Sequence, residues 1–440
     1  MLISILHSST TYSNITYMFL CTILVFLMTP GLAFFYGGLV RKKNSLAIMW
    51  KVFSAIGVVG LMWIFGGFSL VFGNDLGGFI GNPIQFFALH HVIFDIDGRY
   101  GASIPLLMFF MYQLMFAIIT LPLMTGATAG RMNMGGWIGF LICWMILVYF
   151  PVAHWIWGGG FLAKWGFVDF AGGTVIHITA AFSGLMAIWY FGRRKDYDEC
   201  PEPEPSNLGL VAIGAGMLMF GWFGFNAGGT LASNDVAAIA FANTGIAMIC
   251  AMVVWCILDY AFNAHHWSFT QLMTGPIAGA AAVTPASGYV TPLGAIIIGF
   301  CAAVVCYFCV WLAKKLKWDD TLGVWGVHGM GGFLGTILIG CLADPRVNGV
   351  RAGGYQFLVQ LSGALLVAAY SMLVTWLILA ILDHIFHIRT TKEQMDRGLD
   401  PALLHEHYFV DSDVEEAKKA ELAEEAMEEV PASPVSPQNE

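Results

Sequence analysis

Charged residues are scarce in this chain of 440 residues. They make up 11% of it, whereas about 25% of an ordinary soluble domain is charged. Hydrophobic residues make up 58%, and the mean hydropathy is +0.71. This balance excludes a soluble globule. The apolar runs are about 20 residues each, which lets a helix cross a hydrocarbon layer of ~30 Å, and the weak alternating segments of a β-barrel are lacking. We therefore predict an all-α polytopic membrane protein.

Other absences narrow the function. The N-terminus, M-L-I-S-I-L-H-S-S-T, has no basic region ahead of its apolar stretch, so we predict a short exposed lead into the first span rather than a cleaved signal peptide. Nine cysteines are scattered along the chain, and the one C-x-x-C, Cys306 to Cys309, has no second pair. Buried cysteine usually behaves as a small hydrophobe. We expect no metal and no cofactor, and because no nucleophile or cofactor motif is present, we do not expect an enzyme.

The net charge of −9 is concentrated at one end. Residues 411–440 hold ten acidic side chains and two lysines, which leaves 19 acids and 18 bases elsewhere. The nearly neutral body does not indicate a nucleic-acid partner. We predict a membrane domain over 1–388 and a cytosolic acidic tail, partly disordered, over 389–440.

Apolar runs between polar or Gly/Pro breaks predict eleven transmembrane helices. They cover about 17–39, 46–73, 102–125, 134–153, 170–192, 207–228, 239–262, 270–286, 291–314, 321–342 and 356–387.

Basic residues gather in alternate loops. Clusters follow the first, third, fifth, ninth and eleventh predicted spans, at Arg41-Lys42-Lys43, Arg131, Arg193-Arg194-Lys195, Lys314-Lys315-Lys317, and Arg389 with Lys392. Because cytoplasmic loops carry an excess of lysine and arginine, we predict that the N-terminus lies outside and the C-terminus inside.

One pattern occurs twice in the chain. D-F-A-G-G-T-V-I-H runs from Asp169 to His177, and D-T-L-G-V-W-G-V-H runs from Asp320 to His328. Both copies have Gly five residues before the histidine, Phe five after it and Gly seven after it. The predicted orientation makes the two copies run in opposite directions. Eight residues of helix rise about 12 Å, which places both histidines near the midplane of the membrane.

This doubling predicts an inverted repeat of five helices against five, with a site where the repeats meet. The repeats cover about 17–192 and 207–342, and the last helix, 356–387, is extra. A weaker similarity relates F-Y-G-G at 35–38, near the end of the first span, to F-N-A-G-G at 225–229, near the end of the sixth.

Each repeated residue has a simpler interpretation. Asp169 and Asp320 precede helices and can act as N-caps, although a buried carboxylate near a pore mouth also attracts cations. A lone buried histidine is as often a core residue as a functional one, but two at repeat-related positions favour a shared site. That site lacks the further ligands a zinc ion needs, so a proton-handling pair facing a pore is the better interpretation.

Aromatic residues are abundant near the predicted outer end. Trp155, Trp157, Tyr112, Phe116 and Phe225 fall there. Such residues usually form the belt at a membrane interface, but several converging rings can also hold a small cation by cation–π attraction.

Taken together, several ordered motifs resemble the Amt/Mep/Rh ammonium transporter family, Amt branch, over about residues 17–400. They are F-Y-G-G-L-V-R-K-K-N, Y-Q-L-M-F-A-I-I-T, W-G-G-G, D-F-A-G-G-T-V-I-H, W-F-G-F-N-A-G-G and G-V-W-G-V-H-G-M-G-G. The resemblance implies a homotrimer in the plasma membrane with one pore per subunit. Its cargo is ammonium or ammonia, with methylammonium as a close analogue. The resemblance also implies a cytosolic tail that touches the inner face of the pore and, in many bacterial members, a PII-type signalling protein.

The resemblance also assigns residues to the pore. Trp157 and Phe116 match an external recruitment site for ammonium, with Gly229 and Asp169 beside it. Phe116 and Phe225 match a gate.

The inner part of the pore is assigned in the same way. His177 and His328 match the twin-histidine pair, with Asp169 as the outer aspartate of a proton relay. Phe35 and Tyr36 fall near the inner channel.

Two positions depart from the family pattern. Gly229 stands where many members have a serine hydroxyl, with Thr230 as its neighbour, and Gly130 stands where an acidic residue is common. Three functions remain open from the sequence: transport with net movement of charge, a neutral channel for ammonia gas, and an ammonium sensor that acts through a cytosolic partner.

Overall fold

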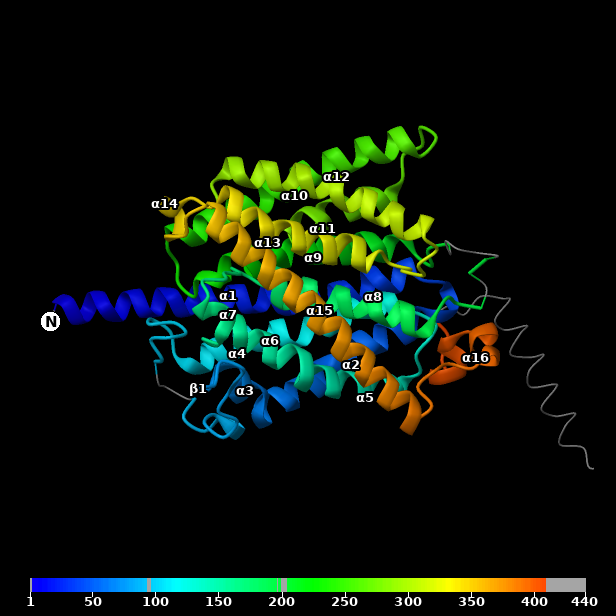
Figure 1. Ribbon diagram of the computed structural model, residues 1–440, viewed down its shortest axis with the longest axis horizontal. Coiled ribbons are helices and arrows are strands. Elements are labelled where there is room, and N and C mark those ends of the chain that lie inside the picture. Colours follow the sequence, from blue (N-terminus) through cyan, green and yellow to red (C-terminus); the bar gives the residue numbers. More distant parts are fainter. Residues whose placement is uncertain (1, 93–95, 196, 199–203, 409–440) are drawn as a thin grey trace, which may run out of the picture.

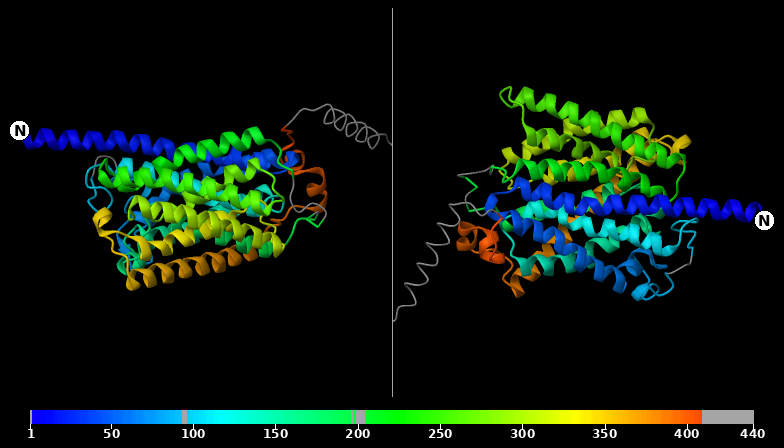
Figure 2. Two further views of the ribbon diagram at one scale, coloured as in Figure 1. Left: turned by 90° about the horizontal axis from the view of Figure 1, so that it is seen from above. Right: turned by 180° about the vertical axis from the view of Figure 1, so that it is seen from behind.

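The computed structural model describes residues 2–92, 96–195, 197–198 and 204–408, with side chains described from residue 11 onward. Most of the acidic stretch predicted as a disordered tail therefore lies outside the described residues. Long helices run side by side along one direction of the molecule (Figures 1 and 2). One end is marked by the short helices α7 and α14 and the other by α16, and we call them the α14 end and the α16 end.

Within the described residues, ten helical segments are long and apolar enough to cross a membrane. They are Thr11–Leu39, Lys42–Phe72, Leu106–Thr128, Met134–Lys164, Gly173–Phe191, Leu208–Thr230, Asp235–Phe262, Pro292–Lys315, Trp325–Leu342 and Gly354–Ile385. Each matches a predicted span. The one predicted span without such a match is the eighth in chain order, 270–286. It is helix α11, Phe269–Val283, whose 15 residues are too few to satisfy the same criterion.

Several spans combine α-helical segments with 3₁₀ or π-helical segments, which carry the label η. In chain order the elements are α1 Leu2–Leu39, η1 Lys42–Asn44, α2 Ser45–Met62, η2 Trp63–Gly67, α3 Phe68–Phe72, β1 Asp75–Leu76, β2 Ile80–Gly81, η3 Phe87–Leu89, α4 Leu106–Thr120, η4 Leu121–Thr128, α5 Met134–Trp144, η5 Met145–Tyr149, α6 Phe150–Ile156, α7 Phe161–Lys164, η6 Gly173–Ile178, α8 Thr179–Phe191, α9 Leu208–Ala227, η7 Gly228–Thr230, α10 Asp235–Phe262, α11, α12 Pro292–Lys315, η8 Trp325–Gly329, α13 Met330–Leu342, α14 Pro345–Asn348, α15 Gly354–Ile385, α16 Lys392–Arg397 and η9 Asp400–Leu404. The strands β1 and β2 form one antiparallel hairpin.

The first helix is longer than predicted. The N-terminal residues, expected to form an exposed lead, belong to α1, which begins at Leu2 and projects past the body at the α14 end (Figure 2). The stretch before the apolar run contains neither Pro nor Gly. Nothing in it breaks the helix, so the helix continues outward from the span.

Helices α1 and α9 pack closely and in opposite directions. A Cβ added at Gly31 would lie 2.9 Å from Met217 Cβ, and one added at Gly224 would lie 2.6 Å from Leu24 Cβ. The residue number falls along α9 as it rises along α1. Small residues let the two backbones approach, and the opposite directions agree with the predicted relation between the first and sixth spans.

The C-terminal segment packs on the α16 end. The Asp400 carboxylate accepts hydrogen bonds from the backbone N–H groups of Leu46 (3.0 Å) and Ala47 (2.8 Å), at the start of α2. The Leu399 N–H donates to Asn44 Oδ1 (2.9 Å), and Lys195 pairs with Asp396. The part of the predicted tail that the structure describes is therefore docked on the membrane body.

Attachment of this segment is expected to depend on pH. Burial raises the pKa of the Asp400 carboxyl to about 6, against the opposing effect of the α2 backbone N–H groups. Because this pKa is higher in the docked state than in an exposed carboxyl, docking takes up a proton, so the docked state gains stability as the pH falls through about 6 and loses it as the pH rises. We expect hydrogen exchange of residues 392–404, corrected for its intrinsic pH dependence, to slow between about pH 7.5 and pH 5.5. Asp400→Asn should remove this pH dependence, and its persistence in the variant would assign the effect to another group.

Candidate functional site

The two helices that carry the repeated Asp-His pattern cross in opposite directions. Thr174 Oγ1 lies 3.0 Å from Thr336 Oγ1. A Cβ added at Gly332 would lie 2.9 Å from His177 Cβ, and one added at Gly329 would lie 2.9 Å from Ala181 Cβ. As the residue number rises along η6 and α8, it falls along η8 and α13. The predicted antiparallel contact between the two copies is confirmed.

The two copies also share their local geometry. The glycine five residues before each histidine has a positive φ, +109° at Gly172 and +64° at Gly323, a conformation that favours glycine. Each histidine lies in a π-helical segment, η6 or η8. Each aspartate caps the segment that follows. Asp320 accepts from the N–H groups of Val324 (3.0 Å) and Trp325 (2.9 Å).

Asp169 is bound more extensively than Asp320. Its two carboxylate oxygens accept four backbone N–H groups at 2.7–3.0 Å, and the carboxylate is buried. The donors are Gly172, Gly173, Thr174 and Val175. The capping interpretation is therefore confirmed for Asp169. Asp169 also lines a cavity at the α14 end.

The two histidines face each other. The ring centroids of His177 and His328 lie 5.2 Å apart with an interplanar angle of 17°. Both ring nitrogens of His177 and Nδ1 of His328 are buried without a hydrogen-bond partner among the described residues. Buried polar atoms are normally paired, so these imidazoles are free to interact with a small solute.

Trp222 fixes the plane of the histidine pair. Its ring is nearly parallel to both imidazoles, at 5.6 Å and 25° from His177 and at 6.5 Å and 8° from His328. The indole N–H donates to Thr284 Oγ1 (2.9 Å). No sequence pattern singled out Trp222 as a site residue. Its position one helical turn before Phe225 places both on one face of α9, which is the signal that could have found it.

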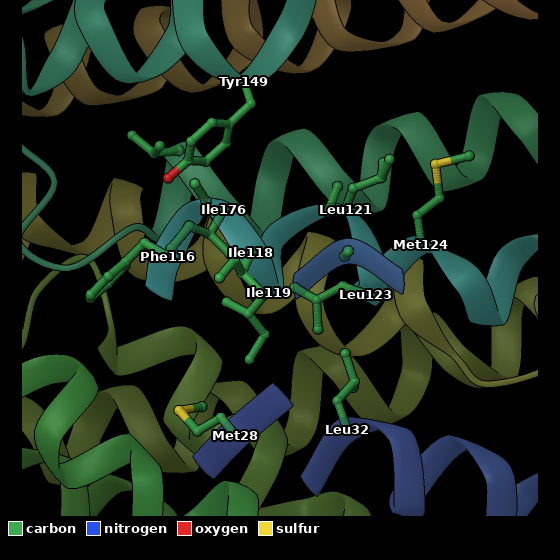
Figure 3. Close-up of a cluster of buried hydrophobic side chains, with 14 of the residues drawn as sticks. Met28, Leu32, Phe116, Ile118, Ile119, Leu121, Leu123, Met124, Tyr149 and Ile176 are labelled. Carbon is green, nitrogen blue, oxygen red and sulfur yellow. The ribbon is translucent and has the colours of Figure 1, made fainter. Parts of the chain in front are cut away.

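The histidines line a narrow apolar chamber. Its other lining residues are almost all aliphatic or aromatic: Met28, Leu32, Phe35, Ile119, Leu123, Ile176, Leu218, Trp222, Phe225 and Ile277. Figure 3 shows the buried cluster around it, with Leu32 and Leu123 turned toward one another. The chamber leaves about 10 Å³ of free volume, which is at the lower limit for one water molecule. It is a narrow, mostly apolar constriction, and we call it the dry chamber.

An aromatic contact separates this chamber from a larger cavity. The rings of Phe116 and Phe225 lie 4.5 Å apart, and Trp157 lies edge-on to Phe116 at 6.0 Å and 89°. Phe116 and Trp157 line a cavity of about 360 Å³ at the α14 end, which we call the aromatic cavity. From the dry chamber to the aromatic cavity, the rings follow in the order Phe225, Phe116, Trp157. These are the residues predicted to form the gate and the recruitment site.

The W-G-G-G motif holds Trp157 in place. The indole N–H donates to the Asp169 carbonyl (2.8 Å), and a Cβ at Gly158 would lie 2.1 Å from the Val71 carbonyl oxygen, so only glycine fits there. The hairpin β1–β2 supports the motif through Asp75, which pairs with His154 and with Lys164. The hydrogen bond with His154 has the largest effect and that with Lys164 the next, and together they lower the pKa of Asp75 to about 2. The carboxylate therefore stays ionised at physiological pH.

Both departures from the family pattern have a structural reason. Gly229 lines the aromatic cavity, where a Cβ would lie 2.9 Å from the Phe170 carbonyl oxygen. The neighbouring Thr230 hydroxyl lies within bonding distance of the carbonyls of Ala227 and Ala232. Gly130 has φ +76°, which favours glycine.

A third cavity, of about 370 Å³, lies at the α16 end, and we call it the polar cavity. Asp319, Asp320, Gln271 and Thr274 line it, together with Val327, the residue before His328. Burial raises the pKa of the Asp320 carboxyl to about 6, while its backbone hydrogen bonds and Arg131 lower it. The aromatic cavity, the dry chamber and the polar cavity thus follow one another through the molecule.

Other predicted residues are placed as follows. Phe35 lines the dry chamber, whereas the Tyr36 hydroxyl donates to the Leu123 carbonyl (3.1 Å) and Tyr36 is not among the lining residues. Trp155 is not among the residues that line the aromatic cavity, and its indole N–H donates to the Phe79 carbonyl (3.0 Å). Within the described part of the chain, no group of three or more His, Cys, Asp or Glu side chains could hold a metal ion.

The chain is similar to known proteins over most of its length. A family model described as Ammonium Transporter Family matches residues 16–408. An ammonium transporter of Aquifex aeolicus is 44% identical over 396 residues, which is 89% of this chain and 92% of that protein. The crystal structure of Candida albicans Mep2 superposes with a TM-score of 0.81 at 34% identity and covers 87% of each chain. A structure titled Sensor Amt Protein superposes with a TM-score of 0.82 at 28% identity and covers 90% of this chain and 99% of that one. The match over nearly the whole chain shows that this protein belongs to the Ammonium Transporter Family.

Proposed function

We propose that this chain transports ammonium by separating its proton from ammonia at the entrance of the dry chamber. The cation is recruited in the aromatic cavity by Trp157 and Phe116, with Asp169 and Gly229 at the same site. It loses a proton near the gate formed by Phe116 and Phe225, and ammonia then passes His177 and His328. The observation that carries this proposal is the pair of stacked imidazoles, three of whose ring nitrogens have no hydrogen-bond partner in the described part of the chain, in a chamber with about 10 Å³ of free volume.

Electrostatics favours loss of the proton. Each aromatic ring contributes about 0.5–2 kcal/mol to holding a cation as water is shed. Moving an unpaired ion into an apolar chamber costs far more than this. Desolvation can lower the pKa of an amine by up to about 3–5 units, and ammonium is slightly more acidic than a lysine side chain. The neutral molecule is therefore the form that enters the chamber.

The histidines suit passage of a small amine. A neutral imidazole has one nitrogen that donates and one that accepts a hydrogen bond, so the pair can bind ammonia on either side without a net charge. The nitrogens without partners supply this capacity. We infer that a proton follows through this pair, from the region of Asp169 to the polar cavity, where ammonia is protonated again. Phe35 and Tyr36 stand on the inner side of that path.

The topology follows from the same reasoning. We infer a 5+5 inverted repeat over 17–192 and 207–342 with an extra helix at 356–387, supported by the antiparallel packing of α1 with α9 and of the two histidine helices. The α14 end faces outward and the basic α16 end faces the cytosol. The protein is a multi-pass protein of the plasma membrane. We infer that 1–388 is the membrane domain and 389–440 the cytosolic tail, and that the protein assembles as a homotrimer.

A sensor function is the second candidate. It is favoured by the likeness to the structure titled Sensor Amt Protein and by the docking of α16 and Asp400 on the membrane body. A cytosolic partner such as a PII-type protein would read the state of that segment.

Uptake of labelled methylammonium into proteoliposomes, with and without a membrane potential, tests the proposal. We expect protein-dependent uptake that increases when the interior is made negative. Uptake that ignores the potential would assign a neutral ammonia channel, and binding without uptake would assign a sensor.

A further inference from the structure

The aromatic cavity contains an amide that no other group uses. Gln113 lies in α4 and lines the cavity together with Phe116 and Trp157. It is half-buried, and among the described residues its side chain has no hydrogen-bond partner. Because residues three apart lie on one face of a helix, Gln113 stands one turn from Phe116 on the side of the cavity.

Ammonium needs hydrogen-bond acceptors as well as aromatic rings. It carries four N–H groups, and rings alone leave all of them without the oxygen partners that water gave. A side-chain hydroxyl at position 229 is absent, because the residue is glycine and Phe170 fills the adjoining space. Another acceptor must face the cation.

Several other polar groups of the cavity already make hydrogen bonds or are exposed. Asn234 Oδ1 accepts the Ala237 N–H (3.0 Å), and the Tyr112 hydroxyl donates to the Phe225 carbonyl (2.9 Å). The oxygens of Asp169 already hold four N–H groups. Asn348 is exposed at the rim.

We propose that the side-chain carbonyl oxygen of Gln113 accepts an N–H of ammonium in the aromatic cavity and so supplies the acceptor that Gly229 lacks. The inference rests on the proposed recruitment site. A carbonyl can rotate to face the cation while the amide nitrogen turns away. The bond distinguishes ammonium from quaternary ammonium ions, which the rings also attract but which have no N–H to donate.

Transport kinetics in proteoliposomes test this role. Gln113→Met keeps the length of the side chain and removes the acceptor, and Gln113→Leu is a second variant in case the first is poorly folded. A hydrogen bond to a charged group is lost, so we expect the KM for methylammonium to rise about 10- to 100-fold with Vmax within about twofold. Gln356→Met, the same change at a glutamine outside the aromatic cavity, should leave KM within about twofold.

Inhibition by tetramethylammonium separates this bond from a structural effect. Its inhibition constant should be unchanged in Gln113→Met, because it makes no hydrogen bond. An unchanged KM for methylammonium, or a matching loss of tetramethylammonium inhibition, would overturn the role of Gln113. Trp157→Leu tests the recruitment site itself. If the KM of this variant is also unchanged, the proposed site is wrong. If its KM rises while that of Gln113→Met does not, only the role of Gln113 is rejected.

Discussion

Asp169→Asn is expected to abolish methylammonium uptake and to lower the thermal unfolding temperature of the purified protein. Both carboxylate oxygens accept two backbone N–H groups each. Asparagine has only one side-chain oxygen. Its NH2 group would replace the other oxygen and would face two backbone N–H groups, which it cannot accept. Each buried N–H left without a partner costs about 1–3 kcal/mol, so the loss is about 2–6 kcal/mol. The start of η6, which carries His177, would be displaced.

Asp320→Asn is the matched control for this prediction. Its carboxylate accepts only one N–H on each oxygen, so asparagine loses one bond rather than two. We expect a smaller loss of stability and residual uptake. Thermal unfolding in detergent and uptake in proteoliposomes measure both effects. Wild-type stability and uptake in Asp169→Asn would show that the four hydrogen bonds do not position the histidine segment.

Gly332→Ala is expected to reduce uptake by at least about tenfold. The added Cβ would lie 2.5 Å from the Gly173 carbonyl oxygen and 2.9 Å from His177 Cβ. The first of these contacts is with backbone, which cannot rotate away, so the two helices must separate. Overpacking of this kind costs about 1–3 kcal/mol. The separation would break the stacking of His177 on His328 and admit water to the dry chamber.

Gly331→Ala provides the control, because the adjacent glycine has room. A Cβ there would meet its nearest neighbours at 3.5–3.6 Å, which is ordinary van der Waals contact. We expect wild-type uptake and a small increase in stability from the better helix propensity of alanine. Equal effects of the two variants would contradict the view that Gly332 sets the separation of the histidine helices.

The sequence was sufficient to predict the helical membrane fold and the meeting of the two repeated histidines. Apolar run length located the spans, and the repeated Asp-His spacing predicted that His177 and His328 meet. Both conclusions depend on local periodicity and on the cost of polar groups in a membrane, which the sequence displays directly. The extent of α1 was missed, because a polar stretch can continue a helix as easily as end it.

Other features depend on contacts that no local pattern reveals. Asp400 lies about 350 residues from the α2 backbone that it caps. Its sequence neighbours indicate only a polar tail. Trp222 and Gln113 belong to two of the family-like motifs, yet whether each lines a cavity depends on which face of α9 and α4 borders that cavity. The direction of a side chain is decided by packing between helices, which the order of residues alone does not fix.

The most direct test compares ammonium with K⁺ in proteoliposomes that contain the wild-type protein. The two cations have the same charge and nearly the same size, but only ammonium can release a proton and become neutral. If the histidine pair lies in a dry passage that excludes charge, an ammonium gradient produces a protein-dependent current or change in internal pH, and an equal K⁺ gradient produces no protein-dependent current. A K⁺ current of similar size would show that intact cations pass between His177 and His328.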